Sequence, residues 1–302
     1  MLLLQENAKL IGQGITGSEG SKGLPTMLDY GTQVVAGVTP GKGGQEVLGV
    51  PIYNSVKEAQ SAVGQVDGSV IYVPPLFVKG AVIEAIEAGI KFILIFTEKV
   101  PAADSAYIYA LAKESGVSLV GPSAVGLISP SRKLKIASIG GATPDRVFAL
   151  GHIAVVSKSG SMTSELGLHL KNNGLGVSWA VGIGGDIIAG TDFADFILAV
   201  EEDDNTQASV FFGELGGTYE QRVGEHVKEG KIQKPVVAFI GGDFTLSLPS
   251  EVQFGHAGAI IEGERGRPDF KRKFLRECGV LVAENFDEIA KLLKESINGG
   301  GT

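Results

Sequence analysis

The sequence has very little cysteine and no long hydrophobic run. Cys278 is the single cysteine among 302 residues, which excludes an internal disulfide and a metal site built from several cysteines. This usage predicts a reduced, cytoplasmic setting. No apolar run reaches the roughly 18 residues that a membrane span needs. The first residues also lack the basic start and long apolar core of a signal peptide, so we expect no membrane partner.

The chain also lacks an excess of positive charge. Lys and Arg number 26 against 34 Asp and Glu, and the net charge of −8 argues against nucleic acid as the main partner. An anionic small molecule remains compatible, because backbone dipoles can bind phosphate even on an acidic protein. Histidine is scarce, and no two histidines have metal-ligand spacing, so we predict no resident metal. The four are His152, His169, His226 and His256.

What the chain does contain is typical of an α/β protein. Hydrophobic residues make up 44% and charged residues 20%, which predicts a globular chain, and its length allows two domains. Its 44 glycines are spread along the chain, as tight turns after strands would require. We place a first domain at 1–130, a connecting segment rich in Gly, Pro and Ser at 131–147, and a second domain at 148–302.

Short apolar runs alternate with helix-like segments in both halves, which predicts two parallel, doubly wound sheets. The predicted strands are 9–12, 33–38, 69–73, 92–96 and 118–120, then 152–157, 176–181, 208–212, 235–240 and 279–282. The predicted helices are 56–63, 78–88 and 103–114, then 161–172, 193–201, 220–229, 271–277 and 286–297.

A glycine cluster follows the first predicted strand. Gly12, Gly14 and Gly17 have the spacing of a dinucleotide-binding turn, where backbone amides and a helix N-terminus hold a diphosphate. Taken alone, this spacing is weak evidence for a nucleotide-binding loop. A nicotinamide site expects an acidic residue after the second strand, but here Lys42 lies on a glycine-rich loop. This lysine favours coenzyme A, which carries a diphosphate and a separate ribose phosphate. A solvated loop lysine and an NAD-dependent dehydrogenase are the alternatives.

Two further loops follow strands of the first half. They are Val73-Pro74-Pro75-Leu76-Phe77 and Phe96-Thr97-Glu98-Lys99-Val100-Pro101. Ligands bind at the carboxyl ends of the strands in this architecture. We therefore expect these loops to form apolar walls for an adenine ring or a pantetheine arm.

In the second half, Ser159, Gly160 and Ser161 lie between a strand and a helix. The free amides of such a helix start form an anion site, and the serines would be extra donors. Ordinary helix capping by either serine is the simpler interpretation. Glu214 follows another strand on a glycine loop, where its carboxylate could accept a hydrogen bond from a histidine nitrogen and fix the tautomer. A solvated loop carboxylate is its alternative.

His256 stands among small residues, in Gly255-His256-Ala257-Gly258. The lack of bulk lets another chain element or a phosphate approach the imidazole closely. An imidazole can act as a base, a metal ligand or a nucleophile, and a nucleophilic nitrogen can carry a phosphoryl group. A histidine in a tight turn is the plain alternative.

With these motifs together, the chain resembles the α subunit of succinyl-CoA synthetase over nearly its whole length. The resemblance implies a Rossmann-like domain that binds coenzyme A, followed by a flavodoxin-like ligase domain. It also implies that His256 is phosphorylated with Glu214 as its partner, and that a β subunit with an ATP-grasp fold binds ATP with Mg²⁺ in a hetero-oligomer. The expected coenzyme A site consists of Thr16, Gly17, Ser18, Glu19, Lys42, Val73, Pro74, Phe96, Thr97 and Glu98.

Some segments look more like ATP-citrate lyase. These are 121–126, 213–218, 249–256, and 133–136 followed by Gly140-Gly141. The sequence ends at Thr302 without a segment for cleaving citryl-CoA, so we expect an α-like subunit that forms citryl-CoA from citrate, coenzyme A and ATP, as in citryl-CoA synthetases. Succinate is the second candidate acid. A non-catalytic regulatory protein that binds coenzyme A is the alternative from another class.

Overall fold

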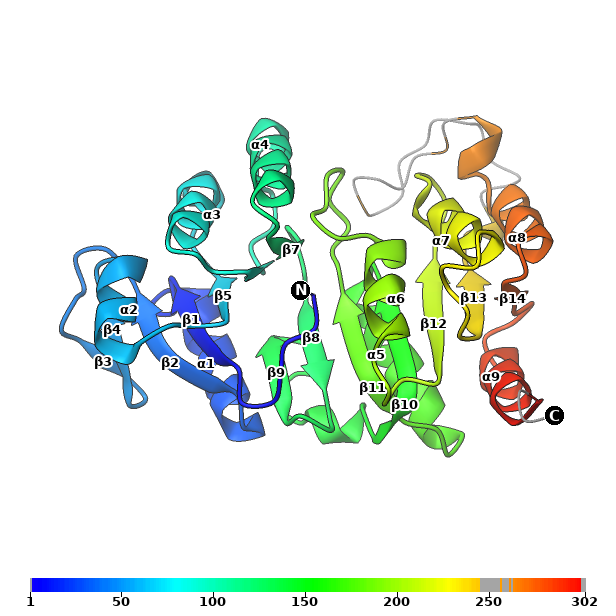
Figure 1. Ribbon diagram of the computed structural model, residues 1–302, viewed down its shortest axis with the longest axis horizontal. Helices are drawn as coiled ribbons and strands as arrows, with labels where there is room; N and C mark the ends of the chain where they lie inside the picture. Colours follow the sequence, from blue (N-terminus) through cyan, green and yellow to red (C-terminus); the bar gives the residue numbers. More distant parts are fainter. Residues whose placement is uncertain (1, 245–255, 257–260, 262, 300–302) are drawn as a thin grey trace. The chain divides into compact units, whose positions relative to one another are not determined.

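The computed structural model describes residues 2–244, 256, 261 and 263–299. It divides the chain into two compact units (Figure 1). The first comprises Met1–Pro144 with Ile188–Thr191, and the second comprises Asp145–Ile187 with Asp192–Thr302. The division falls within the predicted connecting segment 131–147, which itself contains a strand, β9 (Leu134–Ala137).

The first unit is built on a sheet in the order β3-β4-β2-β1-β5-β6-β7. Apart from the short antiparallel edge strand β3, the paired strands run parallel. The strands are β1 (Lys9–Gln13), β2 (Gln33–Val38), β3 (Glu46–Val47), β4 (Val50–Tyr53), β5 (Gly68–Ile71), β6 (Phe92–Ile95) and β7 (Ser118–Val120). Every residue of β5 and β6 is buried, as expected for strands covered on both faces.

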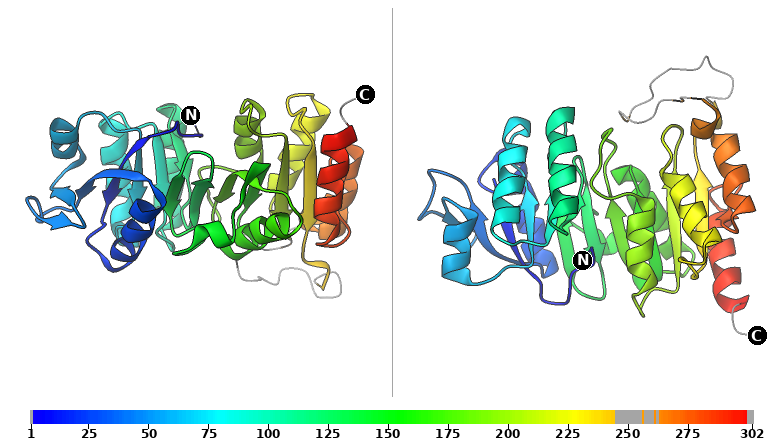
Figure 2. Two further views of the ribbon diagram at one scale, coloured as in Figure 1. Left: turned by 90° about the horizontal axis from the view of Figure 1, so that it is seen from below. Right: turned by 45° about the horizontal axis from the view of Figure 1, so that its top comes forward.

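The helices of this unit are α1 (Ser18–Tyr30), α2 (Val56–Val63), α3 (Val78–Glu87) and α4 (Ala102–Glu114). The chain moves one way across the sheet from β1 to β2 and the other way from β4 to β7. Because crossovers are right-handed, α1 covers one face and the other three helices cover the opposite face (Figure 2). A hairpin of β8 (Gly126–Ser129) and β9 follows, with β9 in contact with α1.

The second unit has parallel strands in the order β14-β13-β12-β10-β11. They are β10 (Leu150–Ser157), β11 (Val177–Gly182), β12 (Ala208–Gly213), β13 (Val236–Ile240) and β14 (Leu281–Val282). The helices are α5 (Gly160–Asn172), α6 (Phe193–Glu201), α7 (Tyr219–Lys228), α8 (Pro268–Glu277) and α9 (Glu288–Gly299). The carboxyl ends of β10, β11 and β12 lie at one edge, with Ser157 opposite Gly182 and Phe212.

The predicted α/β architecture with two largely parallel sheets is confirmed. Each predicted strand and helix has a counterpart, and the bounds of α2 and α6 agree with the prediction. The structure adds β3, β4 and the β8–β9 hairpin, for which the sequence analysis named no strands, and α1, for which it gave no helix range. Within the described residues, no helix has the length and apolar character needed to span a membrane.

Candidate functional site

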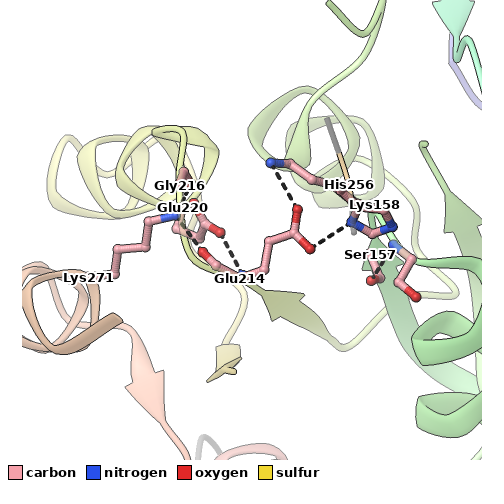
Figure 3. A network of polar contacts seen from close by, with 8 residues as sticks. Ser157, Lys158, Glu214, Gly216, Glu220, His256 and Lys271 are labelled. Atoms are coloured by element: carbon pink, nitrogen blue, oxygen red, sulfur yellow. Dashed lines mark hydrogen bonds and ion pairs between the residues drawn. The ribbon is translucent and has the colours of Figure 1, made fainter. Parts of the chain in front are cut away.

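The second unit brings His256 and Glu214 together at the carboxyl edge of its sheet (Figure 3). Nδ1 of His256 lies 2.8 Å from Oε2 of Glu214, which is the first residue after β12. An ionised carboxylate can only accept hydrogen bonds, so Nδ1 carries the proton. In the neutral imidazole, Nε2 then keeps its lone pair and is the nitrogen available as a nucleophile.

The charges around this pair favour an ionised Glu214. Burial raises the pKa of Glu214, but the hydrogen bond from His256 and the charge of Lys158 lower that pKa by more, and the net shift is downward. The hydrogen bond to Glu214 raises the pKa of His256 against the opposing effect of burial. Asp186, after β11, raises the pKa of His256 further, whereas Lys158 lowers it.

Lys158 contacts the other oxygen of the Glu214 carboxylate. It follows β10 directly, its side chain is only 7% exposed, and Nζ lies 3.5 Å from Oε1 of Glu214. The same ammonium lies 4.6 Å from the centre of the Tyr219 ring. One carboxylate oxygen therefore faces an imidazole and the other faces a buried ammonium.

The close approach of His256 explains the glycine at position 185, in the loop after β11. A Cβ built on this residue would lie 2.5 Å from Cγ and 3.0 Å from Cβ of His256. Ordinary carbon–carbon contacts are at about 3.5–4.0 Å, so no larger side chain fits here without moving the imidazole. The missing bulk next to the histidine thus comes partly from a loop far from it in sequence. Residues 251–255 and 257–259, which flank His256, lie outside the described residues.

The predicted anion site at Ser159, Gly160 and Ser161 lies at the start of α5. Ser159 is the N-cap residue, and its hydroxyl oxygen accepts a hydrogen bond from the amide of Met162 at 3.3 Å. The capping interpretation therefore holds for Ser159, while Ser161 is exposed in the first turn. A helix start leaves further amides without intrahelical partners. Phosphate binding at this point stays a prediction.

In the first unit, the loops after β1 and β2 meet. The amide of Gly14 donates to the carbonyl of Val38 at 2.8 Å, and Gly14 has a φ of 83°, which glycine adopts readily. Nζ of Lys42 lies 3.2 Å from the Thr16 hydroxyl oxygen. The amides of Gly41 and Gly43 donate to the side-chain oxygen of Asn54 at 2.9 and 3.1 Å, which holds the Lys42 loop in place.

The loops after β5 and β6 are also joined. The Thr97 hydroxyl donates to the carbonyl of Val73 at 2.7 Å, and the ring of Phe96 lies 5.3 Å from that of Tyr72. Pro74 and Glu98 are exposed on these loops. At the start of α1, Gly17, Ser18 and Glu19 are exposed, and Glu19 forms an ion pair with Lys22 at 2.8 Å. The predicted coenzyme A residues thus lie on carboxyl-end loops of this sheet, except Ser18 and Glu19, which form the first turn of α1.

Several residues of the second unit were not predicted to take part. Lys158 directly follows β10 and precedes the predicted anion site, and Gly185 lies on the glycine-rich loop after β11. These positions at the carboxyl ends of strands were the available signal. Glu220 and Lys271, which bind the backbone of Glu214, had no such signal because both lie on predicted helices. Across the described ranges, no cluster of three or more His, Cys, Asp or Glu side chains could hold a metal ion.

The chain matches two sequence families. Residues 5–99 match the CoA binding domain, and residues 150–295 match the Succinyl-CoA ligase like flavodoxin domain. The first match covers the loops that carry Lys42 and Thr97. The second covers Glu214 and His256. The predicted order of a coenzyme A-binding domain and a flavodoxin-like ligase domain is therefore confirmed.

Full-length relatives agree with these matches. The chain is 44% identical over 290 residues to the α 1 subunit of an ADP-forming succinate–CoA ligase of Archaeoglobus fulgidus, covering 96% of each chain. It is 42% identical over 300 residues to the α subunit of the corresponding ligase of Staphylococcus epidermidis, covering 99% of this chain and 96% of the relative.

A solved structure is also similar. ATP citrate lyase from Methanothrix soehngenii, in complex with citrate and coenzyme A, superposes with a TM-score of 0.89 at 27% identity. The superposition covers 99% of this chain but 51% of the lyase chain, so this chain spans about half of its length.

Proposed function

The chain belongs to the succinate–CoA ligase α-subunit family, and we propose from this premise that it is the α-like subunit of an ADP-forming acid–CoA ligase. The observation that carries the proposal is the hydrogen bond of 2.8 Å between His256 Nδ1 and Glu214 Oε2. It leaves Nε2 of His256 as the nitrogen that receives a phosphoryl group.

His256 would relay this group in two steps. Nε2 attacks the γ-phosphorus of ATP, and ADP leaves with the electron pair of the broken bond. A carboxylate oxygen of the acid then attacks the same phosphorus, which frees Nε2 and gives an acyl phosphate. Glu214 keeps the proton on Nδ1 and stabilises the positive charge that develops on the ring during the first step. The amides of Gly160 and Ser161 would stabilise the bound phosphoryl group.

Coenzyme A would bind in the first unit. Backbone amides after β1 and the ammonium of Lys42 suit its phosphates, and the loops with Val73 and Phe96 suit its less polar parts. The predicted site residues on these loops are retained in the proposal. The coenzyme A thiol attacks the acyl carbon of the acyl phosphate, and inorganic phosphate leaves.

Two observations bear on the identity of the acid. Relatives that are 42–44% identical over nearly their whole length are named for succinate, so we propose succinate as the favoured acid substrate. Citrate, the acid favoured by the sequence segments, remains the second candidate, because a lyase with bound citrate superposes over 99% of this chain. Both are small acids with at least two carboxylates.

A β-like subunit with an ATP-grasp fold is the proposed partner in a hetero-oligomer. It would bind ATP with Mg²⁺, and much of the acid pocket would lie on it. Within this chain we propose residues 1–130 for coenzyme A binding and 148–302 for the phosphohistidine, with 131–147 between them.

Phosphorylation of the complex tests the proposal. Incubation with γ-labelled ATP should give an acid-labile, base-stable label on this chain, and His256→Asn should abolish the label. Label that persists in His256→Asn would overturn the assignment. Succinate and citrate should then be assayed in parallel for thioester formation. Faster turnover of citrate would reverse the order of the two acids without affecting the relay.

A further inference from the structure

Two fully buried charged side chains lie next to Glu214 without touching His256 in the described contacts. They are Glu220 of α7 and Lys271 of α8, whose side chains have 0% exposure and whose charged groups lie 2.6 Å apart. Lys and Glu are almost never fully buried unless they are paired, because loss of hydration is unfavourable for a charge. The pairing of two such residues directly behind the histidine's partner suggests a role beyond packing.

The pair binds both backbone polar groups of Glu214 (Figure 3). The amide of Glu214 donates to Oε1 of Glu220 at 3.1 Å. Nζ of Lys271 donates to the carbonyl oxygen of Glu214 at 2.7 Å and to that of Gly216 at 2.5 Å. Its third hydrogen bond goes to Oε2 of Glu220, so all three N–H groups of the ammonium are used.

The loop that these contacts hold contains two glycines, and the amide of Gly216 also donates to the carbonyl of Gly266 at 2.9 Å. Gly216 and Gly217 follow Glu214 with φ of 78° and 59°, a region where glycine has more freedom than other residues. Thr218, the N-cap residue of α7, makes no side-chain capping hydrogen bond. Among the described contacts, the buried pair supplies the hydrogen bonds to the backbone of Glu214 itself.

We propose that the Glu220–Lys271 pair is a positioning device for phosphoryl transfer, which fixes the backbone of Glu214 so that its carboxylate meets Nδ1 of His256. This inference rests on the proposed role of His256. A displacement of the carboxylate by about 1 Å would break the hydrogen bond to the imidazole, and misplacement of this size at a reacting centre lowers a rate by about 100-fold.

The pH dependence of phosphorylation separates positioning from a general effect on folding. Among the described residues, the charged groups that face His256 are Glu214 after β12, Lys158 after β10 and Asp186 after β11. Only a neutral imidazole can attack ATP, so the rate rises with pH through the pKa of His256. If Glu214 is no longer held in place, His256 loses the group that raises its pKa most. The inflection in the plot of phosphorylation rate against pH then moves to lower pH.

The test replaces both partners in the complex, as Glu220→Met with Lys271→Met. Removing both charges together avoids leaving one unpaired charge buried. We expect His256 to be phosphorylated by γ-labelled ATP about 100-fold more slowly, with the inflection at lower pH. Lys135→Met is the matched control, because Lys135 is also fully buried but lies in the first unit, bound to Thr26 and Ala137. It should keep the wild-type rate and inflection.

Each outcome is informative. Wild-type complex that takes no label would overturn the proposed function itself. If the wild-type complex is labelled and the double variant keeps the wild-type rate and pH inflection, only the positioning role is overturned. If the double methionine variant does not fold, Glu220→Gln with Lys271→Gln replaces the two charged groups by uncharged polar groups of similar size. A wild-type rate and inflection in that variant would overturn the inference equally.

Discussion

The close approach of Gly185 to His256 gives a quantitative prediction. In Gly185→Ala, the new Cβ would lie 2.5 Å from Cγ of His256, whereas carbon atoms settle at about 3.5–4.0 Å. The imidazole must therefore move by about 1 Å, because the contact is with the inner atoms of the side chain and cannot be relieved at its tip. The hydrogen bond of 2.8 Å between Nδ1 and Glu214 would then be broken.

The expected result is a slower phosphorylation of His256 by about 100-fold, equivalent to about 2.7 kcal/mol in activation free energy. Overpacking of this kind also lowers the free energy of unfolding, by about 1–3 kcal/mol. The assay is single-turnover labelling of the complex with γ-labelled ATP. Coenzyme A binding, measured by calorimetry, should be unchanged because its proposed residues belong to the other unit.

Gly80→Ala is the matched control. Gly80 lies in α3, a Cβ there would meet no atom within 4 Å, and its backbone is not in the left-handed region. The same substitution should therefore leave phosphorylation unchanged and stabilise the helix slightly, by about 0.5–1 kcal/mol. If Gly185→Ala is phosphorylated as fast as Gly80→Ala, the ring does not need its present position and the reasoning is refuted.

Two other changes test the remaining parts of the molecule. Lys42→Ala removes a charged hydrogen-bond donor worth about 1.5–3 kcal/mol, so coenzyme A affinity should fall roughly 10- to 150-fold in calorimetry; an unchanged affinity would place the ligand elsewhere. Burial lowers the pKa of Lys135 from 10.5 to about 8. At this residue the unfolded chain therefore binds more protons than the folded one between these values, and Lys135 should contribute a rise of about 3 kcal/mol to the free energy of unfolding as the pH increases through that window. Lys135→Met should remove this rise in denaturant titrations, and an unchanged rise would refute the assignment to Lys135.

The helices that could be predicted most closely from the sequence carry their own boundary signals. Ser55 accepts a hydrogen bond from the amide of Glu58 at the start of α2, and Asp192 forms a capping box with Asp195 at the start of α6. Capping depends on residues a few positions apart, so it can be read locally. The strands β3, β4, β8 and β9 have two to four residues each, and pairing rather than local pattern defines them.

The site shows the same difference between local and tertiary information. The family resemblance allowed Glu214 and His256 to be paired in advance, whereas the residues alone indicated only that Glu214 could accept a hydrogen bond from a histidine nitrogen. Lys271 lies on α8 among charged residues, a sequence that is typical of a solvated helix face. It is buried where its ammonium meets Glu220, 51 positions away, and the carbonyl oxygens of Glu214 and Gly216. Nothing in the local sequence indicates that contact.

The position of the phosphoryl group on His256 tests the central claim most directly. The complex should be phosphorylated with ATP, and the modified chain examined by phosphorus NMR and by mass spectrometry of its peptides. The hydrogen bond from Nδ1 to Glu214 predicts that the phosphoryl group is on Nε2 of His256. A phosphoryl group on Nδ1, on another residue, or on no residue of this chain would contradict the account.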